Sequence, residues 1–435
     1  MRENELIVYR DFGREGELLS RMAWITRHFQ EKGEKAQKAR AKLYACMSGL
    51  LELAGSHGFY GNLWHCYLSN LLVNHENSYS RACEIRGAVE GTVNDAVLHD
   101  AAIFRELFTL DLDEVSRTLS VPEFGQVLAY EGNEQESRVY NLRIRDRICT
   151  LAVRLAQASS PEEMKERLTE FYREYGVGKF GLHKAFRIGH RRQEDGTEAV
   201  EIEPILNIAH VKLSDLVGYE TAKKKLIENT EAFVSGRKAN NCLLYGDAGT
   251  GKSSSIKAIA NEYYDRGLRI IEVYRHQFRD LNEVIAQIKH RNYKFIIYMD
   301  DLSFEDFETE YKYLKAVIEG GLEKKPDNVL IYATSNRRHL IRENFSDKKE
   351  RDEDLHSNDT VQEKLSLVYR FGVTIYFGAP DKAQFGQIVK ALAKRAGIPL
   401  SEEELLAEAN KWELLHGGLS GRTAQQFIDH LSGTL

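Results

Sequence analysis

A chain of 435 residues is long enough for two or three domains with a sizeable hydrophobic core. Its formal net charge of −6 argues against a protein coated in positive charge for non-specific nucleic-acid binding, although a local basic patch could be concealed by that average. No apolar run approaches the roughly 18 residues of a membrane-spanning helix, and the charged N-terminus does not resemble a signal peptide. Five cysteines without CxxC spacing indicate free thiols, so we expect a cytoplasmic protein without a membrane partner.

Residues 1–205 are expected to form a mainly helical N-terminal domain of unknown role. The stretch 160–175 shows the pattern. Ser160 can cap a helix, Pro161 suits its first position, and Glu163 would complete a capping box. Apolar residues then recur at helical spacing, which indicates a helix packed on a core.

Short apolar runs alternate with helical patterns in the next part of the chain, after a polar stretch that predicts a loop or hairpin at 189–201. Continuous apolar strands separated by helices indicate a parallel sheet covered on both faces. We therefore expect an α/β domain over residues 206–379, followed by a small helical module over 380–435 that includes a capping box from Ser401 to Glu404. The expected strands lie at 241–245, 268–274, 294–299, 328–334 and 372–377.

The strongest motif is "GDAGTGKSSS" at 246–255, which satisfies the phosphate-loop pattern G-x-x-x-x-G-K-[ST] between a strand and a helix. Glycines are needed because backbone N–H groups must curl round the phosphates, and the helix N-terminus adds partial positive charge. Lys252 would neutralise the β- and γ-phosphates, and the Ser253 hydroxyl would ligate Mg²⁺. The residues expected to bind nucleotide in this loop are Gly246, Asp247, Ala248, Gly249, Thr250, Gly251, Lys252, Ser253 and Ser254.

A second half of the site follows in "KFIIYMDDLSF", an apolar strand that ends in two carboxylates. Asp300 is expected to bind Mg²⁺ together with Ser253, and Asp301 to activate the attacking water. A guanine-reading N-K-x-D element does not follow the later strands, so we expect the nucleotide to be ATP.

With these pieces placed, residues 211–435 resemble the AAA+ ATPases. In "LSDLVGYE", the resemblance implies that Val217, Gly218 and Tyr219 lie nearest the adenine base. The resemblance also implies three further catalytic residues. Asn336, after the fourth strand of the core, would be the sensor-1 residue. Arg370, before the next strand, would be the arginine finger, and Arg422, at the start of a lid helix, would be the sensor-2 residue.

"DDLSFE", "ATSNRRHLI" and "SGRTAQQF" are similar to signatures of a bacterial AAA+ family catalogued only as a domain of unknown function. One departure concerns the finger, since Val368 and Tyr369 stand where relatives are expected to carry a Ser-Asp pair. For Arg337 and Arg338 three contact partners stay open, namely the nucleotide, a subunit interface and an acidic loop.

The resemblance implies an ATPase that hydrolyses ATP at the interfaces of a homo-oligomer and drives a conformational change in an unidentified protein client. Two alternatives stay open. One is a loader or accessory ATPase associated with nucleic acid, which the acidic composition does not support. The other is an ATP-dependent switch with very slow hydrolysis. A protein unfoldase is the weakest hypothesis, because Tyr274 and Phe278 do not form the expected pore loop.

Overall fold

The computed structural model describes residues 2–132, 137–192, 196–303, 310–319, 326–336 and 368–434. The chain divides into unit 1, Met1–His183, and unit 2, Lys184–Leu435. Sequence analysis placed the end of the N-terminal domain at residue 205. The structure instead divides the chain ahead of the predicted hairpin, because that hairpin pairs with the sheet of unit 2.

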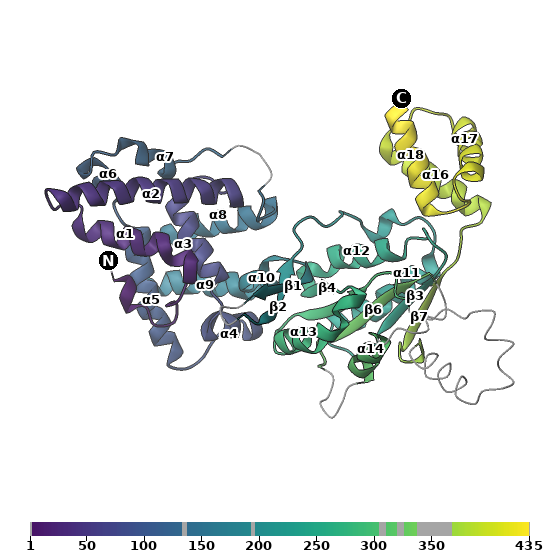
Figure 1. Cartoon of the computed structure of the whole chain (residues 1–435), viewed down its shortest axis with the longest axis horizontal. Coiled ribbons are helices and arrows are strands. Elements are labelled where there is room, and N and C mark those ends of the chain that lie inside the picture. Colours follow the sequence, from purple (N-terminus) through teal and green to yellow (C-terminus); the bar gives the residue numbers. More distant parts are fainter. Residues whose placement is uncertain are drawn as a thin grey trace. The chain divides into compact units, whose positions relative to one another are not determined.

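Unit 1 is helical, as expected for the N-terminal part (Figure 1). Its core contains large side chains that are almost fully buried, including Trp64, Phe104 and Tyr172. Helices α3 and α8 pack together, as do α5 and α9. The α-helices are α1 (Glu17–His28), α2 (Glu34–His57), α3 (Leu63–Asn74), α4 (Ser78–Arg86), α5 (Val93–Phe108), α6 (Leu112–Thr118), α7 (Gly125–Leu128), α8 (Leu142–Ala156), α9 (Pro161–Tyr175) and α10 (Gly178–Leu182).

A buried carboxylate attaches the N-terminal segment to this helical core. Asp100 on α5 is 0% exposed and accepts backbone N–H groups from Ile7 at 2.9 Å, Val8 at 2.7 Å and Tyr9 at 2.9 Å. Charge-assisted hydrogen bonds compensate the desolvation of the buried carboxylate. A chain segment without regular structure is thereby fixed to a helix about 90 residues away in sequence.

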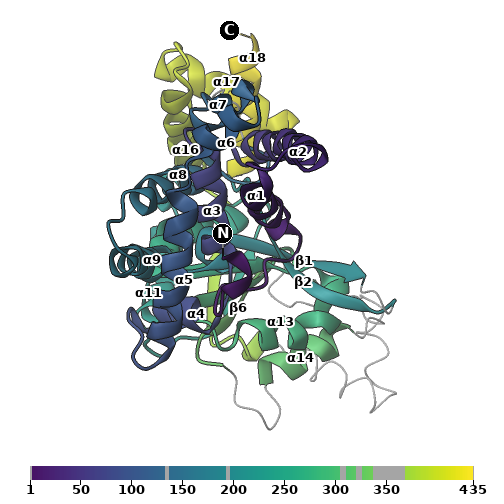
Figure 2. The same ribbon diagram turned by 90° about the vertical axis from the view of Figure 1, so that its left-hand side faces the viewer.

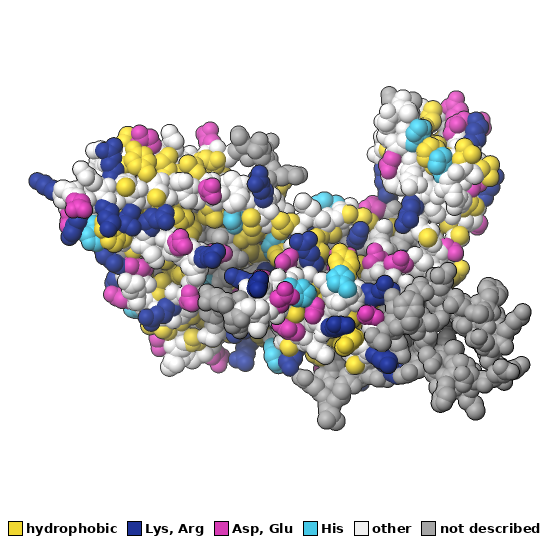
Figure 3. Space-filling model, in the orientation of Figure 1, with side chains coloured by type: hydrophobic (Ala, Val, Ile, Leu, Met, Phe, Trp, Pro, Cys, Tyr) yellow, Lys and Arg dark blue, Asp and Glu magenta, His cyan; other side chains and the backbone are white. Residues whose placement is uncertain are grey.

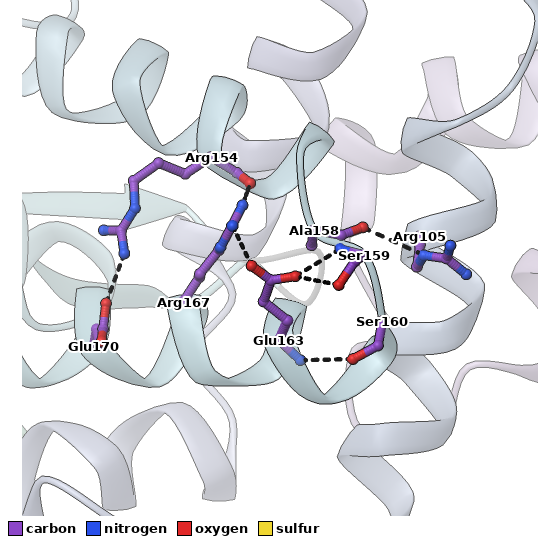
Figure 4. Close-up of polar contacts among 8 residues, drawn as sticks. All are labelled: Arg105, Arg154, Ala158, Ser159, Ser160, Glu163, Arg167 and Glu170. Carbon is purple, nitrogen blue, oxygen red and sulfur yellow. Dashed lines mark hydrogen bonds and ion pairs between the residues drawn. The ribbon is translucent and has the colours of Figure 1, made fainter.

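The N-terminus of α9 differs in one detail from the predicted capping box (Figure 4). Ser160 caps the helix as expected, because its Oγ accepts the Glu163 N–H at 3.2 Å. The Glu163 carboxylate, however, accepts from the backbone N–H and the hydroxyl of Ser159, both at 2.7 Å, and also pairs with Arg167. Two donors on the preceding residue and a neighbouring guanidinium therefore take the place of the Ser160 N–H.

Helices α1 and α2 pack against each other (Figure 2). Lys and Arg side chains gather on one region of unit 1 in the space-filling view (Figure 3). The ammonium groups of Lys38 and Lys42 lie 5.6 and 5.2 Å from the ring centroid of Trp24. Two cations over one indole form a local concentration of positive charge on an acidic protein. We call Trp24, Lys38 and Lys42 the Trp24 patch.

The described residues of unit 2 form a seven-stranded sheet in the order β2-β1-β4-β5-β6-β3-β7 (Figure 1). Every described pairing is parallel except the hairpin of β1 and β2, which extends the sheet beside β4. The predicted parallel α/β fold is therefore confirmed. The strands are β1 (Ala185–Arg192), β2 (Glu198–Pro204), β3 (Cys242–Gly246), β4 (Leu268–Glu272), β5 (Lys294–Met299), β6 (Val329–Ser335) and β7 (Val373–Phe377).

The burial of each strand follows its place in the sheet. All seven residues of the interior strand β6 are buried, whereas burial alternates along the edge strand β7. Figure 1 shows α11 and α12 over one face and α13 and α14 beneath the other. These helices are α11 (Glu220–Val234), α12 (Lys252–Tyr263), α13 (Leu281–Ile288) and α14 (Glu310–Glu319).

Three C-terminal helices form a module with its own hydrophobic core, which we call the lid. Phe385, Val389, Leu405 and Phe427 are among its buried residues. The capping box predicted from Ser401 to Glu404 is confirmed. The lid consists of α16 (Lys382–Ala396), α17 (Glu402–Leu415) and α18 (Gly421–Thr434).

In the described part of the chain, no helix combines the length and the apolar character that crossing a membrane requires. All five cysteines are free thiols and all are buried.

Candidate nucleotide-binding site

The loop between β3 and α12 turns on glycines that no other residue replaces easily. Gly246, Gly249 and Gly251 have φ values of 136°, 74° and 90°, a region that side chains with a Cβ rarely adopt. A Cβ on Gly246 would lie 2.0 Å from the carbonyl oxygen of Phe377 on the adjacent strand. Because these glycines allow close backbone approach and a left-handed conformation, the loop can curve and present its backbone N–H groups at the start of α12.

Lys252, the first residue of α12, is held inside this loop. Its side chain folds back so that Nζ donates to the carbonyl oxygens of Gly246 at 2.9 Å and Asp247 at 2.6 Å. Burial lowers the pKa of Lys252, while the negative charges of Asp247, Asp301 and Asp300 act in the opposite direction. The ammonium group is therefore positioned and partly dehydrated, which strengthens its attraction for an anion.

Asp300, directly after β5, connects the loop helix to the centre of the sheet. Its Oδ1 accepts the hydroxyl of Ser253 at 2.7 Å and the hydroxyl of Thr334, at the end of β6, at 2.6 Å. Burial raises the pKa of Asp300, but the hydroxyl groups of Thr334, Tyr298 and Ser253 outweigh it, so the net pKa lies below its ordinary value. The site thus presents an ionised carboxylate beside a hydroxyl, a set of hard oxygen donors.

Asp301 is joined to Asn336 across two neighbouring strand ends. The side-chain amide of Asn336 donates to Asp301 Oδ1 at 2.8 Å, and the backbone N–H of Asp301 donates to the Thr334 hydroxyl at 2.9 Å. Asp301 has a φ of 49°, which is uncommon for a residue with a side chain and is found at functional turns. The backbone turns sharply here, so consecutive carboxylates make separate contacts.

A cavity of about 750 Å³ extends from this cluster toward the lid. Its walls come from the loop, the strand ends, the segment before α11 and the lid helices. The lining residues are Val211, Asp215, Leu216, Val217, Tyr219, Gly249, Thr250, Gly251, Lys252, Ser253, Ser254, Asp300, Asp301, Thr334, Asn336, Ile388, Leu392, Arg395, Gly421, Arg422 and Gln425.

The segment before α11 forms the apolar end of the cavity, which we call the base end after the adenine base that the resemblance leads us to expect there. Val217 packs against the hydrophobic core of the lid, and the ring of Tyr219 lies 5.4 Å from that of Phe377. Burial, with the charge of Asp247 as a smaller cause, raises the pKa of Tyr219 to about 12. Gly218 has a φ of 81° and supplies the turn between the two lining residues.

The lid reaches the loop through the start of α18. The backbone N–H of Arg422 donates to the Gly249 carbonyl at 3.2 Å, and Arg422 itself lines the cavity. Arg422 therefore lies at the phosphate-loop end of the cavity.

Some of the residues expected in the site do not line the cavity. Among the phosphate-loop residues these are Gly246, Asp247 and Ala248. The Asp247 carboxylate accepts the Ala379 N–H at 2.7 Å. Arg370 lies in the turn before β7 and is not among the lining residues described for this chain.

Some residues considered in the sequence lie outside the described part of the chain. They are Arg337, Arg338 and the charged stretch 342–360, which contains the acidic loop weighed as their partner. Of the two aromatic residues weighed for a pore loop, Phe278 is buried and Tyr274 is 48% exposed.

The residues near the cluster or in the cavity wall that sequence reasoning missed include Tyr298, Thr334, Arg395 and Gln425. Strand alternation could have indicated Thr334, because it lies two positions before Asn336 on the same strand end. The Tyr298 side chain is buried beneath the acids, and burial together with the nearby charge of Asp300 raises its pKa.

Comparison with known proteins gives a family match over the whole of unit 2. The model of a family described as "Protein of unknown function (DUF815)" matches residues 183–435. The replication factor C large subunit of Staphylothermus marinus is 39% identical over 74 residues, which is 17% of this chain and 17% of that protein. The corresponding subunit of Methanococcus maripaludis is 40% identical over 77 residues, 18% of this chain and 15% of that protein. The matches thus span about a sixth of those relatives.

Solved structures with a similar fold include a point mutant of Thermotoga maritima RuvB, with a TM-score of 0.36 and 17% identity over 50% of this chain and 64% of that one. The FIGL-1 AAA domain in complex with ADP has a TM-score of 0.36 and 16% identity over 52% of this chain and 74% of that one.

Replacement of Gly246 by alanine tests the loop geometry. We expect Gly246→Ala to lower the free energy of unfolding by roughly 1–3 kcal/mol, because the new Cβ meets a backbone carbonyl that cannot rotate away. Denaturant unfolding measures the change. Gly433→Ala on α18, where a Cβ has open space, is the matched control and should not destabilise. An unchanged stability for Gly246→Ala would contradict the geometry.

Proposed function

Because the chain belongs to the DUF815 family, a family of the AAA+ type, we propose that it binds Mg·ATP in this cavity and hydrolyses it. The observation that carries the proposal is the 2.7 Å hydrogen bond between Ser253 and Asp300, with the Lys252 ammonium inside the adjoining loop. A hydroxyl and a carboxylate in contact beside a buried cation form a site for a metal–phosphate complex.

The residues present fit a magnesium ion. Ser253 and Asp300 offer oxygen donors, and the net lowering of the Asp300 pKa keeps that carboxylate ionised. When bound, the ion neutralises charge that develops on the phosphate oxygens. Lys252 would exchange its two carbonyl partners for phosphate oxygens, because an anion competes well against neutral acceptors.

Asp301 and Asn336 would orient the attacking water. A carboxylate that accepts one hydrogen bond from an amide keeps a second oxygen available for the water proton, and both residues line the cavity. Arg422 would approach the phosphates from the lid and stabilise negative charge there. Val217 and Tyr219 would contact the base.

We further propose that hydrolysis depends on assembly. Arg370 does not line the cavity of its own chain in the described structure, and it follows Tyr369, which is 84% exposed. Arg370 itself is half-buried, and assembly would bring its guanidinium to the nucleotide of a second copy, as the family resemblance implies. The energy released would drive a conformational change in a protein client, and very slow hydrolysis would make the same site a switch.

The hydrolysis proposal is tested with Asp301→Asn, which removes the charge and keeps the shape. We expect phosphate release to fall about 10²–10⁴-fold while a fluorescent ATP analogue still binds. Lys252→Ala should instead abolish binding, because the loop loses its cation. Lys225→Ala, an exposed lysine on α11, is the control and should leave both measurements unchanged. Full activity in Asp301→Asn would exclude Asp301 as the residue that activates water.

The assembly proposal predicts complementation between two inactive variants. Arg370→Ala alone should hydrolyse ATP about 10³–10⁵-fold more slowly at assembling concentrations. Mixing it with Asp301→Asn should restore part of the activity, because the second variant supplies an intact arginine to the intact site of the first. Mass measurement with a slowly hydrolysed ATP analogue verifies assembly. Mixtures that assemble but stay inactive would rule out an arginine acting between subunits.

An association with nucleic acid is a second candidate, favoured by the Trp24 patch. The two lysines can contact a phosphate backbone, whereas the Trp24 ring already stacks on the His28 ring at a centroid distance of 4.2 Å. The double substitution Lys38→Ala and Lys42→Ala should weaken binding to single- or double-stranded DNA in gel shifts and reduce the salt dependence of the affinity by about two charges. Lys225→Ala is again the control. Absence of binding by the unmodified protein at low salt would exclude this candidate.

A further inference from the structure

The lid is attached at both ends of the cavity. At the phosphate-loop end, the Arg422 N–H donates to the Gly249 carbonyl at 3.2 Å. At the base end, the attachment is made by a side chain, Arg395, near the C-terminus of α16. The family resemblance assigns no role to Arg395, and the position carries no motif.

Arg395 makes three contacts with one short turn, Leu213–Asp215, which precedes the base-binding segment. Its Nη1 donates to the Asp215 carbonyl at 3.0 Å, and its Nη2 donates to the Ser214 carbonyl at 3.3 Å. Nη2 also lies 3.4 Å from Asp215 Oδ1. The planar guanidinium matches this arrangement of oxygens, which a lysine ammonium could satisfy only in part.

The turn that receives Arg395 is itself held in place. Asp215 Oδ2 accepts the Lys212 N–H at 2.8 Å, so both carboxylate oxygens are engaged. Val217, two residues further on, packs against the hydrophobic core of the lid. Polar contacts at the rim and an apolar contact beneath them therefore join the same two elements.

Arg395 and Asp215 also form part of the cavity wall. A lid movement wide enough to open the base end must separate them, because one belongs to the lid and the other to the turn before α11. The Arg395 and Asp215 side chains are 43% and 35% exposed, so water weakens the ion pair, and most of the attachment comes from the two charge-assisted bonds to carbonyls.

We propose that Arg395 is a positioning residue that clasps the lid over the base end of the cavity and thereby sets how long a bound nucleotide stays. The inference rests on the proposed nucleotide-binding function and adds a residue that acts on release. Arg422 and Asp301 would then govern hydrolysis, whereas Arg395 would govern the residence time of the product.

The test measures the dissociation of fluorescently labelled ADP from the full chain after a chase with unlabelled ADP. Arg395→Ala should release ADP roughly tenfold faster, the effect of losing two bonds from a charged donor that are partly replaced by water. Arg395→Lys should fall between it and the unmodified protein. Asp215→Asn, which keeps both carbonyl acceptors, should have a smaller effect. Lys394→Ala removes the same charge from the adjacent exposed position and should leave release unchanged.

Hydrogen exchange of residues 382–396 without nucleotide gives an independent measurement, and exchange should be faster in Arg395→Ala at an unchanged melting temperature. Release at the unmodified rate in Arg395→Ala would overturn the clasp and leave the proposed function standing. Equal acceleration in Lys394→Ala would also overturn it, since the effect would then be one of charge alone. Failure of the unmodified protein to bind ADP or ATP would overturn both proposals.

Discussion

The arrangement of the site depends on one carboxylate oxygen, Oδ1 of Asp300, which accepts two hydroxyls at once. One hydroxyl belongs to Ser253 on the first turn of α12 and the other to Thr334 at the end of β6. Three elements that are distant in sequence are thereby fixed within hydrogen-bond length of a single atom. Because strands β5 and β6 are neighbours in register, Thr334 also receives the Asp301 N–H and directs the second carboxylate toward Asn336. The loop, the acids and the polar residue after β6 thus form one connected network.

Sequence reasoning located the strand ends because the physics there is local. An apolar run that ends in Asp-Asp, and a glycine-rich loop between a strand and a helix, restrict what the chain can form, and the order of the sheet places β6 between the strands that carry the loop and the acids. The phosphate-loop glycines were identifiable for the same reason, since their φ values exclude most other residues.

Contacts between segments distant in sequence could not be predicted from local patterns. The prediction for the cap of α9 was half right. Whether Glu163 accepts from Ser160 or from Ser159 depends on the competing donors and on Arg167, and the capping-box pattern contains no information on either. The hairpin at 189–201 was anticipated, but its pairing with β4 was not. The predicted domain boundary at residue 205 therefore lies after the boundary at His183 in the structure. The role of Arg395 could not be predicted from the sequence, because an arginine near a helix C-terminus is ordinarily explained by the helix dipole.

The five buried cysteines have a practical consequence for the study of this molecule. A thiol reagent reacts only with a sulfur that it can reach, and only with the thiolate; burial raises the pKa of Cys46, for example, to about 11. Native modification rates therefore report transient opening of the surrounding core rather than the chemistry of an exposed group. Four of these thiols lie in unit 1 and one, Cys242, lies at the start of β3. Identifying which sulfur is modified therefore separates the opening of the helical unit from that of the sheet.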